Sequence, residues 1–144
     1  MVDKEKLVKL KSLMEAGADA ADVDAIPVVW DFFVDLANEN EEIQDEIADA
    51  TVRVQMVLTD ADKKYWLKVE EGKMTWGEGT VEDPTFTFSA VKKIGIGMLF
   101  GEVDATSAYM AGDITVEGNL QDAMFFQEII ELSMEIAEDL FDEL

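Results

Sequence analysis

Residues 51–76 read TVRVQMVLTDADKKYWLKVEEGKMTW, and in this stretch the spacing of the apolar residues changes to two. From Val52 to Leu58 every second position is apolar, which predicts a β-strand with one buried face. The segment YWLKV at 65–69 repeats the alternation, and a Glu-Gly turn leads into a third strand that begins at Lys73. The stretch therefore predicts a three-stranded antiparallel meander.

Two further strands and several helices are expected around this meander. The clearest helix is at the end of the chain, where acidic residues from Glu128 to Asp142 recur at a spacing of three and four while nearly all other positions are apolar. The periodicity predicts strands at 85–89 and 113–117, and helices at 3–16, at 26–38 with a short helix after it, twice within 90–111, and at 119–143. The fold class predicted from these elements is α+β.

The composition excludes several classes of function. The 144 residues include 33 acids, 11 bases, no cysteine and no histidine, for a formal net charge of −22. One domain of this length buries a sizeable core without disulfides. The lack of Cys and His excludes a thiolate nucleophile, a Ser-His-Asp triad and the usual zinc ligands. The negative charge disfavours nucleic-acid partners, and no apolar run approaches the roughly 18 residues of a membrane span.

The first 24 residues differ from the rest of the chain. A short amphipathic helix at 3–16 ends at Gly17, and residues 17–25 are small and acidic, as expected of a linker. We therefore expect an N-terminal helical extension and linker at 1–24 and a main domain at 25–144. Lysines and acids interrupt the apolar residues of the first helix, unlike a secretory signal, so we expect a cytoplasmic protein.

Three motifs resemble known binding sites, but each has a simpler structural explanation. The Gly-Ile-Gly run at 95–97 lacks the third glycine of a dinucleotide loop and favours close packing instead. The acids between Asp60 and Glu71 have lysines where a calcium loop needs oxygen ligands. The acidic stripe of the last helix is typical of a solvated face, with a docking surface for a basic partner as the alternative.

Three segments, taken in order, resemble the sterol carrier protein 2 family. They are YWLKVEEG at 65–72, DPTFTFSA at 83–90, and YMAGDITVEGN at 109–119, which is the most specific of the three. The resemblance runs from about residue 26 to the C-terminus. It implies a five-stranded mixed sheet in the order 3-2-1-4-5, covered on one face by helices and enclosing a hydrophobic tunnel.

The resemblance also implies a function and a set of ligand-binding residues. Proteins of this family bind fatty acids, fatty acyl-CoA, sterols and other lipids without altering them, so no catalytic residue, cofactor or metal is expected. The residues expected to line the tunnel are Trp30, Phe33, Met98, Leu99, Phe100, Met110, Phe125 and Ile129. Only Lys92 and Lys93 lie near the crossover helices to meet the phosphates of CoA, so uncharged lipids rank above acyl-CoA.

The leading hypothesis is a non-catalytic carrier for a hydrophobic small molecule such as a lipid, fatty acid or sterol. The alternative is an accessory subunit that docks onto a larger enzyme and presents or shields an apolar substrate; its partner would be that enzyme or a second copy of the chain. An enzyme that uses carboxylates in the tunnel ranks third. The chain ends Asp-Glu-Leu rather than in a peroxisomal tripeptide, which favours a prokaryotic cytoplasm.

Overall fold

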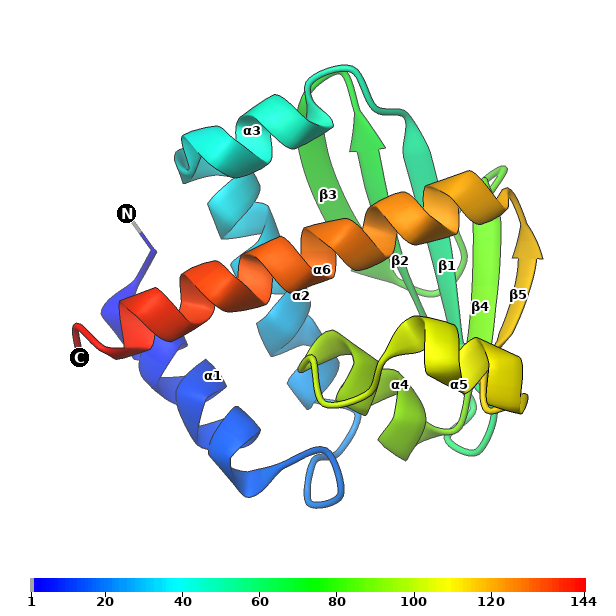
Figure 1. Cartoon of the computed structure of the whole chain (residues 1–144), viewed down its shortest axis with the longest axis horizontal. Coiled ribbons are helices and arrows are strands. Elements are labelled where there is room, and N and C mark those ends of the chain that lie inside the picture. The colour runs from blue at the N-terminus through cyan, green and yellow to red at the C-terminus, as the bar shows by residue number, and fades with distance from the viewer. Residues whose placement is uncertain (1) are drawn as a thin grey trace.

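The computed structural model describes residues 2–144 and has six helices and five strands (Figure 1). The strands are β1 Val52–Leu58, β2 Lys63–Glu70, β3 Lys73–Glu78, β4 Phe86–Ala90 and β5 Thr115–Gly118, and the helices are α1 Lys4–Ala16, α2 Ala25–Glu39, α3 Glu41–Ile47, α4 Lys92–Leu99, α5 Ala105–Ala111 and α6 Leu120–Phe141. The strands form one mixed sheet in the order β3-β2-β1-β4-β5. The predicted α+β class and strand order are confirmed.

The central strand of the sheet is β1. It runs antiparallel to β2, with Met56 opposite Tyr65, and parallel to β4, with Met56 opposite Phe88. β4 in turn pairs antiparallel with β5, with Phe88 opposite Val116. Because residues that face each other across a ladder point to the same side of a sheet, all four side chains share one face.

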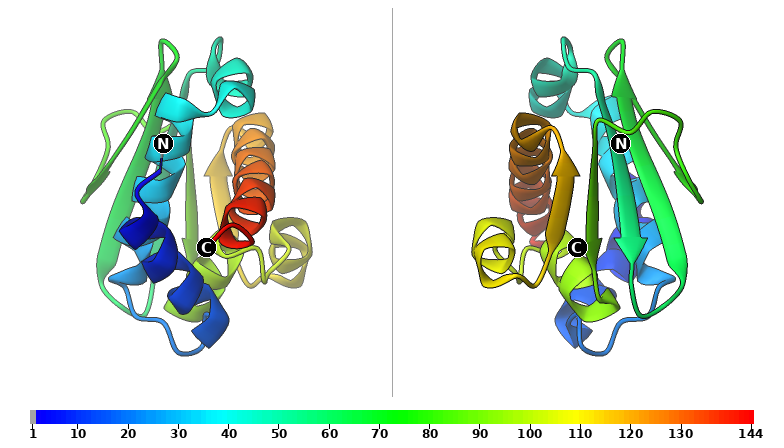
Figure 2. Two further views of the ribbon diagram at one scale, coloured as in Figure 1. Left: turned by 90° about the vertical axis from the view of Figure 1, so that its left-hand side faces the viewer. Right: turned by 90° about the vertical axis from the view of Figure 1, so that its right-hand side faces the viewer.

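The helices cover that face, and Figure 2 shows them on one side of the sheet. Tyr65, Leu67 and Val69 of β2 are buried under them, while the residues between are only partly buried. The same alternation in β4 buries Phe86 and Phe88. The longest helix, α6, begins beside β5 and runs across the sheet towards α1 (Figure 1). The hydrophobic core therefore lies between the sheet and this helical layer.

Helix α1 packs against α2 and α6 rather than standing apart from them. Leu7 and Leu10 are buried and belong to the same hydrophobic core as the sheet residues. The linker that follows is also attached, because the backbone N–H of Ala18 donates to the Glu102 carboxylate at 3.0 Å. The residues predicted as an extension thus contribute to the core of the main body.

The one strand that begins clearly later than predicted is β5, which starts at Thr115 instead of residue 113. Gly112 ends α5 in the left-handed conformation, with φ of 82°. The next two backbone N–H groups, of Asp113 and Ile114, donate to the carbonyl of Ala108 at 2.8 and 3.4 Å. These two residues complete the helix C-terminus, so they are not available to the sheet.

The junction between β5 and α6 sets the position of α6 over β4. The backbone N–H of Asn119 donates to the carbonyl of Thr85 at 2.8 Å, and the Asn119 side chain caps the helix by accepting from the N–H groups of Gln121 and Asp122. Gly118 adopts φ of 107°, and a Cβ there would lie 2.6 Å from the Thr85 carbonyl oxygen. Only glycine allows this close approach.

We expect Gly118→Ala to lower the free energy of unfolding by about 2 kcal/mol or more, because the methyl group both strains the backbone and collides with β4. Gly79→Ala is the matched control. Gly79 has φ of 100°, but an added Cβ meets no atom within 4 Å, so only the backbone strain applies. Urea denaturation of both variants measures the difference. Equal losses would contradict a role for the close approach at Gly118.

Candidate functional site

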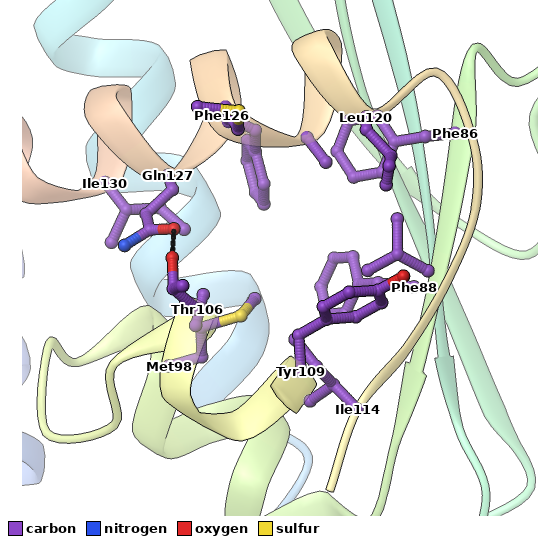
Figure 3. Close-up of a pocket in the computed structure, with 14 residues that line it drawn as sticks. Phe86, Phe88, Met98, Thr106, Tyr109, Ile114, Leu120, Phe126, Gln127 and Ile130 are labelled. Atoms are coloured by element: carbon purple, nitrogen blue, oxygen red, sulfur yellow. Dashed lines mark hydrogen bonds between the residues drawn. The ribbon is translucent and has the colours of Figure 1, made fainter. Parts of the chain in front are cut away.

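An apolar pocket of about 250 Å³ lies between the β4–β5 edge of the sheet and helices α5 and α6. Figure 3 shows the side chains that converge on it from these elements. Its lining residues are Phe86, Phe88, Met98, Ala105, Thr106, Tyr109, Ile114, Val116, Leu120, Ala123, Met124, Phe126, Gln127 and Ile130. The pocket opens to solvent beside α5 and the first turns of α6, where several of these side chains are exposed.

Local sequence periodicity brings the lining side chains to the pocket. Alternation in β4 points Phe86 and Phe88 inward. The helical spacing of three and four on α6 places Ala123, Phe126 and Ile130 on one face towards the sheet. The pocket thus forms where a short helix and a long helix bridge the edge of the sheet.

The inner wall of the pocket is an aromatic cluster centred on Phe126. Its ring centroid lies 5.9 Å from that of Phe86, 6.0 Å from that of Phe88, and 6.2 Å from that of Trp30 on α2. The rings are tilted against one another, which is a favourable arrangement for aromatic pairs. Phe126 therefore contacts β4 at the pocket wall and α2 in the core.

Polar groups gather at one side of the pocket, where Thr106 and Gln127 share a hydrogen bond of 3.5 Å (Figure 3). The Gln127 amide nitrogen also donates to the carboxylates of Asp104, at 3.3 Å, and Glu131, at 3.1 Å. Hydrogen bonds from the hydroxyl and backbone N–H of Ser107 hold the pKa of Asp104 below its ordinary value. Asp104 is therefore negatively charged at neutral pH.

The mouth of the pocket is bordered by exposed apolar side chains. On α5, 45% of Tyr109 and 81% of its neighbour Met110 are exposed. On α6, Leu120 is 52% exposed and Met124 is 64% exposed. We call these four residues the apolar rim. Tyr109, Leu120 and Met124 line the opening, and Met110 is the neighbour of Tyr109 on α5. Single exposed apolar residues are common, but several near one opening are typical of interaction sites.

The lining offers binding contacts rather than reactive groups. Thr106, Tyr109 and Gln127 supply its polar oxygen and nitrogen atoms, and no lining residue is a charged acid or base at neutral pH. Within residues 2–144, no three acidic side chains are arranged to hold a metal ion. In the same part of the chain, no helix is long and apolar enough to cross a membrane.

The model of the SCP-2 sterol transfer family matches residues 33–131, which include all five strands and every residue that lines the pocket. This match covers more than half of the chain. The chain belongs to the SCP-2 sterol transfer family. Membership implies a domain that binds or transfers lipids. Among curated protein sequences, none matches this chain.

Solved structures of this family share the fold. Sterol carrier protein 2 from Yarrowia lipolytica, in its apo form, has a TM-score of 0.58 and 16% sequence identity, covering 74% of this chain and 90% of that chain. The ubiquinone synthesis protein UbiJ-SCP2 has a TM-score of 0.59 and 14% identity, covering 74% and 96%. At these identities the likeness shows the fold alone.

A larger protein contains the same fold as one part. The stereoselective inverting sec-alkylsulfatase Pisa1 from Pseudomonas sp. matches with a TM-score of 0.55 and 16% identity over 60% of this chain. The match covers 14% of the sulfatase chain, and 16% of that chain in a double mutant of the same enzyme. The SCP-2 fold therefore occurs both as most of a chain and as a small part of one.

The structure places the residues predicted to line the tunnel of this SCP-2 domain as follows. Met98 is in the pocket wall. Five others are buried in the core but do not line the pocket: Trp30, Phe33, Leu99, Phe100 and Ile129. Phe125 is half-buried on α6, and Met110 belongs to the exposed apolar rim. Contact of any of the eight residues with a ligand stays a prediction, and so does an enclosed tunnel.

The difference on α6 is one position along the helix. Phe126 and Ile130 line the pocket, whereas the predicted residues were their neighbours Phe125 and Ile129. One residue rotates the side-chain direction by about 100°. On β4 the sequence carried a usable signal, because alternation in the segment at 85–89 turns Phe86 and Phe88 to the helical side. The inward direction on α6 depends on where the helix meets β4.

We expect Phe126→Ala to lower the free energy of unfolding by about 3–5 kcal/mol, because it leaves a cavity among three aromatic rings. Phe125→Ala is the matched control, since it removes the same ring from a half-buried position and should cost less than half as much. Chemical denaturation of the two variants measures both losses. A larger loss for Phe125→Ala would show that α6 is rotated relative to the structure.

Proposed function

We propose that this chain is a non-catalytic carrier that holds a single-chain hydrophobic molecule in the pocket between β4, β5, α5 and α6. The observation that carries the proposal is an open pocket lined almost entirely by apolar side chains in a protein of a lipid-binding family. An apolar pocket that opens to solvent is a favourable site for an aliphatic chain, because burying each CH₂ group contributes about 0.8 kcal/mol.

The size of the pocket supports a slender ligand. Its volume of about 250 Å³ is near the lower end of the roughly 300–1,000 Å³ typical of small-molecule sites. A single alkyl chain fits such a volume better than the fused rings of a sterol. The head of the molecule would remain at the mouth, near Thr106 and Gln127, which supply the polar atoms on that side.

A carrier role also agrees with the chemistry of the lining. Acyl or phosphoryl transfer needs a nucleophile activated by a base, or a general acid and base within reach of the substrate. Thr106 and Tyr109 have hydroxyl groups, but no lining residue is a base positioned to activate them. This arrangement supports binding without conversion of the ligand.

We assign lipid binding to residues 25–144 and regard 1–24 as an extension that stabilises them. The burial of Leu7 and Leu10 of α1, which packs against α2 and α6, supports a stabilising role for the extension. The prokaryotic origin and the cytoplasmic location of the protein stay predictions from the sequence.

Filling the pocket should abolish binding. We expect Ala123→Phe to weaken the affinity for 1-decanol at least tenfold, because the new ring occupies the space that the alkyl chain would fill. Gln121→Phe is the control, since it adds the same ring two residues earlier at an exposed position outside the lining. Isothermal titration calorimetry measures both affinities, and circular dichroism checks that both variants fold. Unchanged binding to Ala123→Phe would place the ligand elsewhere.

A second candidate function is an accessory subunit that delivers its ligand to a larger enzyme. The apolar rim favours it, because three of its exposed side chains, those of Tyr109, Leu120 and Met124, line the mouth through which a ligand would pass. A partner docked there would cover the rim and receive the ligand directly. The occurrence of the same fold within an alkylsulfatase chain agrees with a position beside an enzyme.

Charging the rim separates the two candidate functions. If the protein is an accessory subunit, the native chain should co-sediment with a larger protein from its host, and the variant Met110→Lys should not. The variant should still bind 1-decanol, since Met110 lies outside the pocket lining. Sedimentation of the native protein as a bare chain of 16.0 kDa or as a dimer would contradict the accessory role.

A further inference from the structure

The charge beside the pocket distinguishes between classes of ligand. Two carboxylates, of Asp104 and Glu131, flank Gln127 at the polar side, each within 3.3 Å of its amide nitrogen. Neither carboxylate belongs to the pocket lining, but a headgroup that reaches Gln127 lies within a few ångströms of both. At this range their field acts on the headgroup well inside the Debye length of roughly 10 Å at 0.1 M salt.

Positive charge is missing from the same region. The chain has no lysine or arginine after Lys93, so β5 and α6 carry acids but no bases, and α5 carries no charged residue. The two nearest lysines in the sequence, Lys92 and Lys93, form ion pairs with Asp22 at 3.5 Å and Asp19 at 3.0 Å, on the linker before α2. They are therefore held at the start of α4 and are not part of the pocket lining.

We propose that the pocket selects amphiphiles with a cationic headgroup, such as a protonated long-chain amine, over uncharged ones, and disfavours anionic ones such as fatty acids. This inference rests on the proposed function, because the alkyl chain must occupy the pocket for its headgroup to reach the two carboxylates. A cation there gains two attractive interactions. An anionic headgroup meets two repulsive ones and finds no basic partner.

The expected selectivity is modest because both carboxylates are exposed to solvent. Exposed ion pairs contribute little and are screened by salt, so each carboxylate changes affinity by a small factor. We expect decylamine to bind about fivefold more tightly than 1-decanol, and decanoate to bind more weakly than 1-decanol by a similar factor. The apolar contacts of the alkyl chain are the same in all three.

The experiment is isothermal titration calorimetry at neutral pH with decylamine, 1-decanol and decanoate, the two charged ligands below their micelle-forming concentrations and 1-decanol below its solubility limit. It is run with the full chain at about 0.01 M and about 1 M salt, where the Debye length is roughly 30 Å and 3 Å. The differences among the three ligands should be largest at low salt and nearly vanish at high salt.

A double variant identifies the responsible carboxylates. In Asp104→Asn/Glu131→Gln, the ratio of decylamine to 1-decanol affinity should fall to near one, while 1-decanol binding is unchanged. Asparagine keeps the cap at the start of α5, so the helix should remain intact. The control Glu46→Gln/Glu138→Gln removes the same net charge from exposed positions on α3 and farther along α6, and it should keep the wild-type ratio.

The outcomes separate this inference from the proposed function. If none of the three ligands binds, the proposed function fails and the inference fails with it. If 1-decanol binds but decanoate binds as tightly as decylamine, the carrier role stands and the selectivity is overturned. Equal loss of the ratio in both double variants would also overturn it, because the effect would then come from net charge alone.

Discussion

The packing of Phe126 is the contact on which the rest of the structure depends. Its ring touches Trp30 of α2 and both inward phenylalanines of β4, so it joins three elements that lie far apart in the sequence. This contact holds α6 against the sheet at one rotation about its axis. The same rotation decides which side chains of α6 enter the core, which line the pocket and which face solvent.

The pocket exists because the helical layer does not close over the β4–β5 edge. The short helix α5 ends at Gly112, and the next residues complete its C-terminus before β5 begins. Ile114 and Tyr109 are thereby turned towards the space beneath α6. The result is a mostly apolar lining whose polar atoms lie on one side. The acidic residues of the chain lie outside this lining. The charged groups and the apolar surface are thus separated in space. The carboxylates can therefore select the headgroup of a ligand, while the apolar lining binds its alkyl chain.

Local sequence patterns were enough to predict the fold, but they did not identify most of the residues that line the pocket. Alternation in the segments at 51–76 and 85–89 predicted the strands, since a strand with one buried face needs apolar side chains at every second position. On α6 nearly every residue apart from the acidic stripe is apolar, so the sequence carried no signal to separate Phe125 from Phe126. Only Met98 of the expected lining is in the pocket wall. The other positions depend on contacts between α6, α2 and β4 that are remote in the sequence.

By itself the sequence determined the α+β class, the approximate position of each helix and strand, the family resemblance and the lack of basic residues in the C-terminal elements. These features depend on residue type and on spacing within one element. Tertiary structure alone decided which face of α6 meets the sheet, that Lys92 and Lys93 are paired with the linker, and that Asp104 and Glu131 meet at Gln127. The physical reason is that a pocket is the space left between elements, and its shape depends on how they pack together.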